Sequence, residues 1–396
     1  MKKMLMATTA AALMATTAMA DGHLKEVKLG VLFGFTGPIE SLTGPMSAGA
    51  EMAMKEVTDS GKLFDGAIVT SLRADGGCID NGMATAGAER LIAEGINGLV
   101  GADCSGVTGA VLQNVAIPNG MVMISPSATS PALSTLEDNG LFFRTSPSDA
   151  RQGNVMTNIL LERGYKSIAL TYVNVDYGQG LADAFTTAYE AAGGEITITV
   201  PHEDNKADYS AEVGALAAAG GDILVVAGYL DNGGRGMIQA SLDSGAFDTF
   251  VLPDGMVGAS LPEAIGSDLN GSFGQVPGVD PNKSFVAIAG DNFDATSPFA
   301  AESYDAAALM LLSMQSAGSV DPADYKNKVF DVANAPGEKI YPGELGKALD
   351  ILSAGGEIDY VGASAVELIG NGESVGNYRE IEIKNSKIET VRYRQK

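Results

Sequence analysis

Two turns rich in serine and threonine are the first candidates for binding chemistry. Ser105 lies in the turn Gly101–Gly106, which follows a predicted strand and opens a predicted helix. The run Ile124–Pro131 (ISPSATSP) follows another predicted strand and carries Thr129 between two prolines. Hydroxyl groups and the free amides at the start of a helix suit an anion such as a carboxylate. A simple helix cap at Ser105 and an ordinary Ser/Pro loop would give the same pattern, and the sequence leaves both open.

A carboxylate and two tyrosines hold comparable positions in the second half of the chain. Tyr177 opens a predicted helix, Tyr229 ends a predicted strand, and Asp254 follows the short strand Phe250–Leu252. Open α/β sheets place ligands at the carboxyl ends of their strands, so these groups are expected to face the hydroxyls of the first half. The pairing suits a zwitterion, whose carboxylate would meet the hydroxyls and whose ammonium would meet Asp254. Taken singly, each aromatic residue could equally be part of the packing.

The sequence lacks the residues that several classes of enzyme need. The chain has two histidines, His23 and His202, and no G-x-S-x-G, so a nucleophile with a histidine base is not expected. The first strand–helix turn holds Pro38 and lacks G-x-G-x-x-G, and no phosphate-binding G-x-x-x-x-G-K-[ST] occurs. We expect no cofactor and no metal. A hydrolase with paired carboxylates stays open, because Asp and Glu are plentiful.

The length of the chain and its net charge limit the domain organisation and the kinds of binding partner that are expected. With 396 residues the chain is expected to form two domains. It carries 25 Lys and Arg against 49 Asp and Glu, a formal net charge of -24. This charge argues against nucleic acid and anionic membrane surfaces, which would repel it. A monomer is the simplest expectation for the oligomeric state.

The first twenty residues are typical of a secretory signal peptide. Lys2 and Lys3 precede an apolar stretch that is too short to span a bilayer, and Ala18-Met19-Ala20 forms a small-residue cleavage site. We therefore expect cleavage after Ala20 and a periplasmic destination. The two cysteines, Cys78 and Cys104, suit such an oxidising compartment, and a disulfide is favoured over a metal site because no histidine lies near them in sequence.

Strand-like and helix-like segments alternate along most of the chain. Val27–Phe35 is a continuous apolar run, Met46–Val57 has helical spacing, and the pattern repeats in units of about 30 residues. It restarts near residue 148, and Arg379–Lys384 with Lys387–Arg394 read as an antiparallel hairpin. The alternation predicts an α/β protein with two doubly wound parallel sheets.

The chain resembles a known family. The segments VKLGVLFGFTGP, DGGCID, GADCSGVT, MVMISPSATSPAL, FFRTSPSDARQG, DYGQGLADAF and VVAGYLDNG occur in the order typical of periplasmic Leu/Ile/Val-binding proteins, the type I solute-binding proteins of ABC importers. The resemblance implies two Rossmann-like lobes joined by three hinge crossings. It implies residues 21–146 with 275–376 for lobe I and residues 147–274 with 377–396 for lobe II.

The resemblance also implies roles for single residues. Ser105 and Thr129 match positions that hold an amino-acid carboxylate, and Ser127 matches one whose carbonyl takes the ammonium. The expected ligand-binding set is Leu42, Ser105, Ser127, Ala128, Thr129, Tyr177, Tyr229, Asp254 and Tyr304. The family's disulfide corresponds to Cys78 and Cys104. The implied function is capture of a small, aliphatic amino acid by cleft closure and delivery to membrane permease subunits, without enzymatic turnover.

Two departures leave the ligand open. The acid that binds the ammonium in this family is usually Glu, whereas Asp254 is one methylene shorter. The first pocket loop often carries an aromatic residue, whereas this chain offers Leu42. An amide, urea or an aromatic or other carboxylic acid is therefore an alternative ligand.

Overall fold

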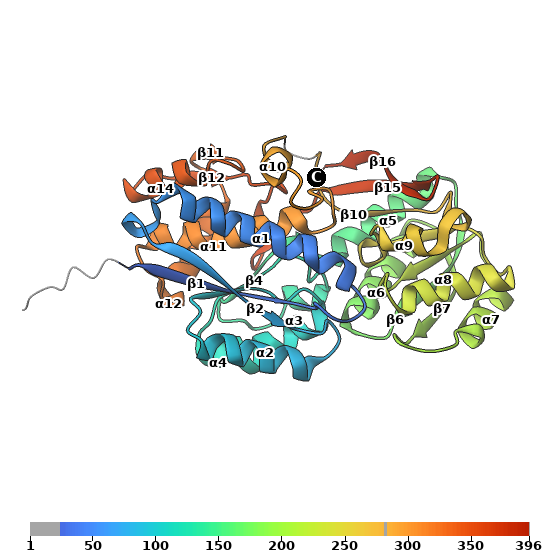
Figure 1. Cartoon of the computed structure of the whole chain (residues 1–396). Helices are drawn as coiled ribbons and strands as arrows, with labels where there is room; N and C mark the ends of the chain where they lie inside the picture. The colour runs from blue at the N-terminus through green and yellow to red at the C-terminus, as the bar shows by residue number, and fades with distance from the viewer. Residues whose placement is uncertain (1–23, 281–282, 396) are drawn as a thin grey trace, which may run out of the picture.

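Two lobes lie side by side, each built on one sheet with helices on its faces (Figure 1). The structure, a computed structural model, describes residues 24–280 and 283–395. The expected signal peptide, residues 1–20, lies outside the described residues. None of the described helices is both long and apolar enough to cross a lipid bilayer.

The sheet of the first lobe is mostly parallel. Its strand β1 carries Val27, Leu29 and Val31, which are fully buried because helices cover both faces of the sheet. A strand in this position needs a continuous apolar run, which the sequence supplies. Among the described residues the spatial order is β13 (Leu368–Ile369), β14 (Glu373–Ser374), β5 (Phe142–Pro147), β4 (Met123–Ser125), β3 (Gly98–Gly101), β1 (Glu26–Phe33) and β2 (Ile68–Asp75).

The sheet of the second lobe is parallel except for a C-terminal hairpin. The hairpin turn holds Asn385 at φ 51° and Ser386 at φ 56°, the left-handed pair that a tight two-residue hairpin turn requires. The described strands follow the order β16 (Lys387–Arg394), β15 (Tyr378–Lys384), β10 (Phe273–Pro277), β9 (Phe250–Leu252), β8 (Ile223–Ala227), β6 (Ser167–Val173) and β7 (Glu195–His202). A separate two-stranded sheet pairs β11 (Glu338–Ile340) with β12 (Ile358–Tyr360).

Helices pack on both sheets. Those of the first lobe are α1 (Glu40–Ser60), α2 (Asn81–Ala93), α3 (Ser105–Val111), α4 (Ile117–Asn119), α10 (Lys283–Ala289), α11 (Ala300–Ala317), α12 (Pro322–Tyr325), α13 (Val329–Ala333) and α14 (Leu345–Ser353). Those of the second are α5 (Asp149–Glu162), α6 (Asp176–Ala191), α7 (Ser210–Ala219), α8 (Gly233–Ser244) and α9 (Ser260–Ile265).

The long helices α1 and α11 lie against each other on one face of the first sheet (Figure 1). Gly49 allows their close approach, because a Cβ atom at this position would lie 2.3 Å from the carbonyl oxygen of Ala300. Two acidic residues of α11, Glu302 and Asp305, are buried with its apolar residues. The helix is thus enclosed on nearly all sides. Burial of this kind is unusual for Asp and Glu side chains.

The chain passes between the sheets three times: after β5, after β10, and between β14 and β15. This confirms the predicted two-lobed α/β fold with three crossings. The strand β10, which precedes the second of these crossings, belongs to the second sheet. That strand extends across the predicted lobe boundary at residues 274 and 275, and the lobe ranges stay a prediction.

Other elements differ from the sequence-based expectation or could not be expected from a periodic pattern. The helix expected from Met46 begins at Glu40, although Pro45 lies within it. The 3-10 turn Lys326–Lys328 separates α12 from α13. The strands β11 to β14 are only two or three residues long, too short for a periodic pattern to reveal.

A disulfide connects two loops near the carboxyl ends of the first sheet. Cys78 and Cys104 are bonded, with their Cα atoms 5.1 Å apart, which confirms the predicted pairing. Cys104 directly precedes Ser105 at the start of α3. The bond therefore fixes the loop after β2 to the turn that presents Ser105.

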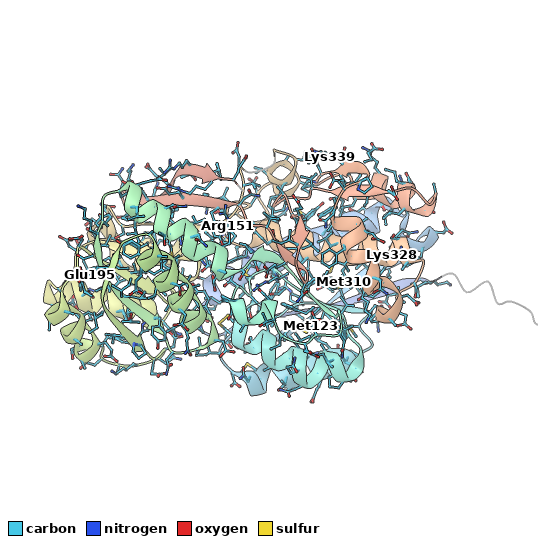
Figure 2. The ribbon with its side chains drawn as sticks, turned by 180° about the vertical axis from the view of Figure 1, so that it is seen from behind. Met123, Arg151, Glu195, Met310, Lys328 and Lys339 are labelled. Carbon is cyan, nitrogen blue, oxygen red and sulfur yellow. A yellow bond between two sulfur atoms is a disulfide. The ribbon has the colours of Figure 1, made fainter. Side chains whose placement is uncertain are left out.

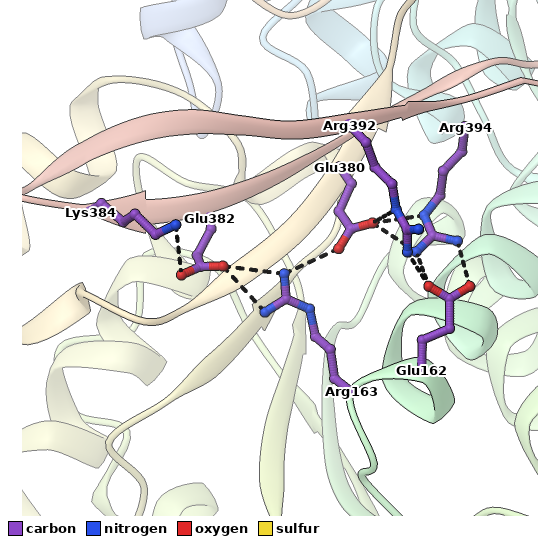
Figure 3. A network of polar contacts seen from close by, with 7 residues as sticks. All are labelled: Glu162, Arg163, Glu380, Glu382, Lys384, Arg392 and Arg394. Atoms are coloured by element: carbon purple, nitrogen blue, oxygen red, sulfur yellow. Dashed lines mark hydrogen bonds and ion pairs between the residues drawn. The ribbon is translucent and has the colours of Figure 1, made fainter.

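An ion-pair network fastens the C-terminal hairpin to the end of α5 (Figure 3). At its centre is Glu380, whose side chain is 3% exposed and accepts from the Nε atoms of Arg392 and Arg394 at 2.9 and 2.8 Å. Arg163 donates to Glu380 at 3.1 Å and lies 4.1 Å above the ring of Phe273 in β10. The network therefore joins α5, β10 and the hairpin, all of which adjoin a crossing between the lobes.

Candidate functional site

A small cavity lies between the two lobes at the carboxyl ends of their strands. Its lining comes from both lobes: Ile39, Leu42, Asp103, Cys104, Ser105, Ser127, Tyr177, Tyr229, Asp254, Gly255 and Phe299. Six of the nine residues expected from the sequence are among them. The cavity measures about 20 Å³, room for about one water molecule. An amino acid has several times that volume, so the lobes must separate to admit one.

Asp254 gives the second-lobe wall its charge. It begins the turn after β9, and its side chain is 1% exposed. Its Oδ1 accepts hydrogen bonds from the hydroxyl of Tyr177 at 2.6 Å and from the amide of Gly255 at 2.8 Å. Its Oδ2 is buried and has no hydrogen-bond partner among the described residues. One carboxylate oxygen is therefore anchored, and the other is free to accept from a ligand.

Two stacked tyrosines complete this wall. Their rings lie 5.0 Å apart between centroids with an interplanar angle of 18°. Tyr177 stands at the start of α6 and Tyr229 after β8, so two neighbouring strand–helix units supply them. Burial, and next the charge of Asp254, raise the pKa of Tyr177 well above its ordinary value. Its phenol therefore stays protonated and serves as a donor to Asp254.

The first-lobe wall presents hydroxyl groups. Ser105 is the first residue of α3, and its Oγ accepts from the amide of Ser130 at 3.1 Å, which leaves its own proton to donate. Ser127 donates its hydroxyl to the carbonyl of Asp103 at 2.9 Å. These contacts tie the turn before α3 to the loop after β4. The two predicted hydroxyl turns are therefore adjacent, and of the two serines that line the cavity Ser105 is the one with an uncommitted donor.

Two further expected residues are buried close to the cavity but do not line it. Thr129 is 1% exposed, and its hydroxyl has no hydrogen-bond partner of standard geometry among the described residues. Ala128 is fully buried, and its carbonyl accepts from Arg144 at 3.0 Å and from Ser146 at 3.3 Å. In the closed arrangement both residues therefore support the loop that carries Ser127.

The expected contact by Tyr304 is corrected. Its ring is fully buried in α11 and packs 5.5 Å from the ring of Phe285, and its hydroxyl donates to Glu56 at 2.6 Å. Phe299, the residue before α11, lines the cavity instead. It has φ 62°, a left-handed conformation that is uncommon for a bulky side chain.

Sequence reasoning also missed Ile39 and Asp103. Ile39 precedes α1, three residues before the expected Leu42, and extends the apolar part of the lining. Asp103 precedes the disulfide Cys104, and its oxygens accept from the amides of Gly34 at 2.6 Å and Cys104 at 2.9 Å. Their neighbours in sequence pointed to the same loops, so closer attention to residues beside the expected ones would have found both.

The electrostatic environment of the cavity is acidic. Among the described residues that line it, none is Lys, Arg or His. Burial raises the pKa of Asp103 to about 6, although the amides of Gly34 and Cys104 oppose this. Burial also raises the pKa of Asp254, opposed by the hydrogen bond from Tyr177. Such a site favours a ligand that brings a positive group and disfavours a simple anion.

Direct contacts between the lobes hold the cavity closed. The amide of Asp231, two residues after Tyr229, donates to the carbonyl of Pro38 at 3.0 Å. Its carboxylate accepts from the amide of Ser41 at 3.0 Å and from the hydroxyl of Ser260 at 2.7 Å. The bonds to Pro38 and Ser41 join the start of α1 and the loop before it to the second lobe. Ser260 belongs to the second lobe itself, and its hydroxyl lies 3.1 Å from that of Ser41 across the lobes.

A larger groove of about 780 Å³ runs along α6 and the start of α5. Its lining is mostly small, with Gly180, Ala184 and Ala188 beside Asp176 and Asp183. Figure 2 shows Arg151, near the start of α5, between the lobes, and Glu195 on the second lobe. Neither aspartate of the groove is buried. The smaller inter-lobe cavity, with its free carboxylate oxygen, is therefore the candidate site.

Known proteins are similar to this chain in sequence and in fold. The model of the family described as periplasmic binding protein matches residues 26–334. A leucine-, isoleucine-, valine-, threonine- and alanine-binding protein of Pseudomonas aeruginosa is 28% identical over 329 residues, which is 81% of this chain and 85% of that protein.

Two solved structures support the fold. The leucine binding protein LivK of Thermotoga maritima superposes with a TM-score of 0.78 at 20% identity, covering 93% of this chain and 98% of that chain. A solute binding protein of an ABC transporter from R. palustris, in complex with benzoate, gives a TM-score of 0.73 at 19% identity, covering 93% and 96%. With the family match over most of its length, the chain belongs to the periplasmic binding protein family.

Proposed function

We propose that this chain is the periplasmic ligand-binding component of an ABC importer and that it captures a small amino acid with an apolar side chain. The observation that carries the proposal is the free Oδ2 of Asp254 in a cavity whose opposite wall presents the hydroxyl of Ser105. Such walls match the two charged ends of an amino acid. Its relative in Pseudomonas aeruginosa is named for binding aliphatic amino acids and threonine.

The ligand would bind as the lobes close. The ammonium would donate to the free oxygen of Asp254, and the carboxylate would accept the proton of Ser105. Ile39, Leu42 and Phe299 would surround the side chain. Closure excludes water, which strengthens these few polar contacts. The bonds of Asp231 to Pro38 and Ser41 across the lobes would then favour the closed population.

A second candidate ligand is an aromatic carboxylic acid. A protein of the same fold is described in complex with benzoate. In this chain Asp103 and Asp254 are buried beside the cavity, and none of its described lining residues is a cation. An acid without an ammonium would therefore meet uncompensated negative charge, and we favour the amino acid. An amide or urea would lack the positive group that Asp254 would pair with.

The proposal includes the protein's place in the cell. Cleavage after Ala20 would release a mature periplasmic monomer, which would carry its ligand unchanged to permease subunits in the membrane. The lobes would comprise residues 21–146 with 275–376 and residues 147–274 with 377–396. N-terminal sequencing of protein from a periplasmic fraction tests the cleavage: a first residue other than Asp21 contradicts it.

Calorimetry with a ligand panel tests the function. Leucine, isoleucine, valine and alanine are titrated in parallel with benzoate, urea and acetamide, an amide without an ammonium group. We expect binding by at least one aliphatic amino acid and none by benzoate. Binding of benzoate or urea alone would overturn the proposal. Mass spectrometry of the released ligand separates a carrier, which returns it unchanged, from a carboxylate-based hydrolase.

A further inference from the structure

Two buried acidic residues, Asp149 and Asp254, are bridged by the side chain of Gln152. Asp149, at the start of α5, is fully buried, and Asp254 is 1% exposed. Gln152 connects them: its Nε2 donates to Oδ1 of Asp149 at 2.5 Å, and its Oε1 accepts from the amide of Asp254 at 3.0 Å. Each carboxylate keeps one buried oxygen without a hydrogen-bond partner among the described residues. Only Asp254 lines the cavity.

Within the part of the chain that the structure describes, no cation neutralises this pair. The nearest arginine that acts on it, Arg144, places its Nη atoms on the carbonyls of Ala128 and Ser130, on Ser134 and on Glu373. Gln275 donates its Nε2 to Gln152 at 3.1 Å, and its own Oε1 has no hydrogen-bond partner among the described residues. The donors that do reach the two carboxylates, from Gln152, Tyr177 and the amide of Gly255, are neutral and add no positive charge.

Other charged and titratable groups face the pair from each neighbouring element. They are Arg144 of β5, Arg151 of α5, Tyr177 of α6, Tyr229 after β8, Tyr378 of β15, and Asp103 across the cavity. The hydroxyls of Thr129 and Tyr378 have no hydrogen-bond partner of standard geometry among the described residues. The hydroxyl of Thr129 nevertheless lies beside Asp149 and partly lowers the pKa of that carboxyl. None of these groups adds a cation in contact with a carboxylate oxygen of the pair.

Two like charges in a dry site cannot both stay ionised without a partner. We propose that Asp149 and Asp254 act as one acidic pair, which holds a proton in the free protein and releases it to solvent when a ligand ammonium binds Oδ2 of Asp254. Asp149 is then a positioning residue that acts through Asp254 and does not touch the ligand. The inference rests on the proposed function, because it requires an ammonium ligand.

The proton balance is simple. The free pair carries one proton and one negative charge; the occupied pair carries two negative charges and faces the positive ammonium. The ammonium keeps its own protons, and the displaced proton goes to the buffer. The pKa directions agree: burial and then the charge of Asp254 raise the pKa of Asp149 well above its ordinary range, and burial raises that of Asp254.

The sign of the pH effect follows. Binding that releases a proton is favoured as pH rises, so the affinity should increase by up to tenfold per pH unit while the free pair is protonated. It should level off once the free pair has ionised. A site with a permanently ionised Asp254 would show a flat profile over the same range.

Titration calorimetry in buffers of different ionisation enthalpy tests the inference, because it counts released protons. The tightest-binding amino acid of the panel is used from about pH 5.5 to about pH 8. We expect release of close to one proton per ligand in the lower part of this range. Asp149→Asn, which preserves shape and the hydrogen bond from Gln152, should reduce the release toward zero and flatten the profile, with binding retained.

A matched control is available in the same lobe. Asp204 is half-buried, accepts from the amide of Gly233 at 2.7 Å through Oδ1, and keeps a buried Oδ2 without a hydrogen-bond partner among the described residues. Asp204→Asn should leave the proton release of the parent protein unchanged. An equal reduction in both variants would overturn the role assigned to Asp149.

The outcomes separate this inference from the proposed function. Failure of every amino acid to bind would overturn both. Binding by the parent protein with no proton release and a flat pH profile would overturn the acidic pair alone, and this measurement does not depend on whether Asp149→Asn folds. Full release retained in a folded Asp149→Asn protein would also overturn it.

Discussion

Replacing Asp254 with Asn perturbs one atom of the candidate site. Asn can keep the two hydrogen bonds that Oδ1 receives from Tyr177 and the amide of Gly255. Its Nδ2 then stands where Oδ2, the free oxygen, stood. The change therefore removes the charge and turns the acceptor into a donor while the local fold is preserved.

The size of the effect follows from burial. An ammonium about 3 Å from the carboxylate gains about 5.5 kcal/mol at an effective dielectric constant of about 20. Leaving one member of a buried ion pair without its partner costs about 3–5 kcal/mol. That range corresponds to a roughly 150- to 3,500-fold rise in Kd.

Calorimetry with the tightest-binding amino acid measures this loss. Asp204→Asn, which changes a half-buried carboxylate of the same lobe that does not line the cavity, is the control and should bind within about threefold of the parent protein. A Kd for Asp254→Asn within threefold of the parent, in a variant that melts normally, would refute the assignment of the ammonium to Asp254.

The remaining predictions concern stability. Cys78→Ser opens a disulfide with a sequence separation of 26, which should lower the free energy of unfolding by about 3.5 kcal/mol, read from urea unfolding; an unchanged midpoint would count against it. Burial raises the pKa of Glu302 from its ordinary 4.5 to about 8. The native state then holds more protons than the unfolded state, so stability declines as pH rises from about 4.5 to about 8. Glu302→Gln should be more stable than the parent near pH 8 and similar near pH 5 in thermal melts; equal melting curves at pH 8 would contradict this. Glu380→Gln leaves three arginines without their buried partner and should cost about 3 kcal/mol in denaturant titrations, whereas the exposed Glu389→Gln should cost little; equal losses would be the contrary result.

The hydrophobic periodicity and the polar residues at strand ends were enough to predict most of the fold and about half of the residues that line the cavity. The strands Phe250–Leu252 and Lys387–Arg394 begin and end where the sequence indicated. Buried parallel strands need unbroken apolar runs, and glycines mark their ends, so both signals are local. Asp254 is predictable because it follows a short apolar strand within two residues, at the edge where open α/β sheets bind their ligands.

The rest depends on contacts that sequence does not encode locally. Phe299 reaches the cavity from the start of α11, about 250 residues from Leu42, and only the third dimension reveals this. Tyr304 lies one turn further along the same helix and contacts Glu56 instead. Asp149 belongs to the segment FFRTSPSDARQG, but its closeness to Asp254 arises from the packing of α5 against the second sheet, which no local pattern indicates.

The most direct test is a crystal structure of the protein with the amino acid that binds it most tightly. The ligand should lie between the lobes, with its ammonium nitrogen within hydrogen-bond distance of Oδ2 of Asp254 and its carboxylate on the hydroxyl of Ser105. A ligand seated in the groove along α6, or one between the lobes with its carboxylate turned toward Asp254, would contradict the account.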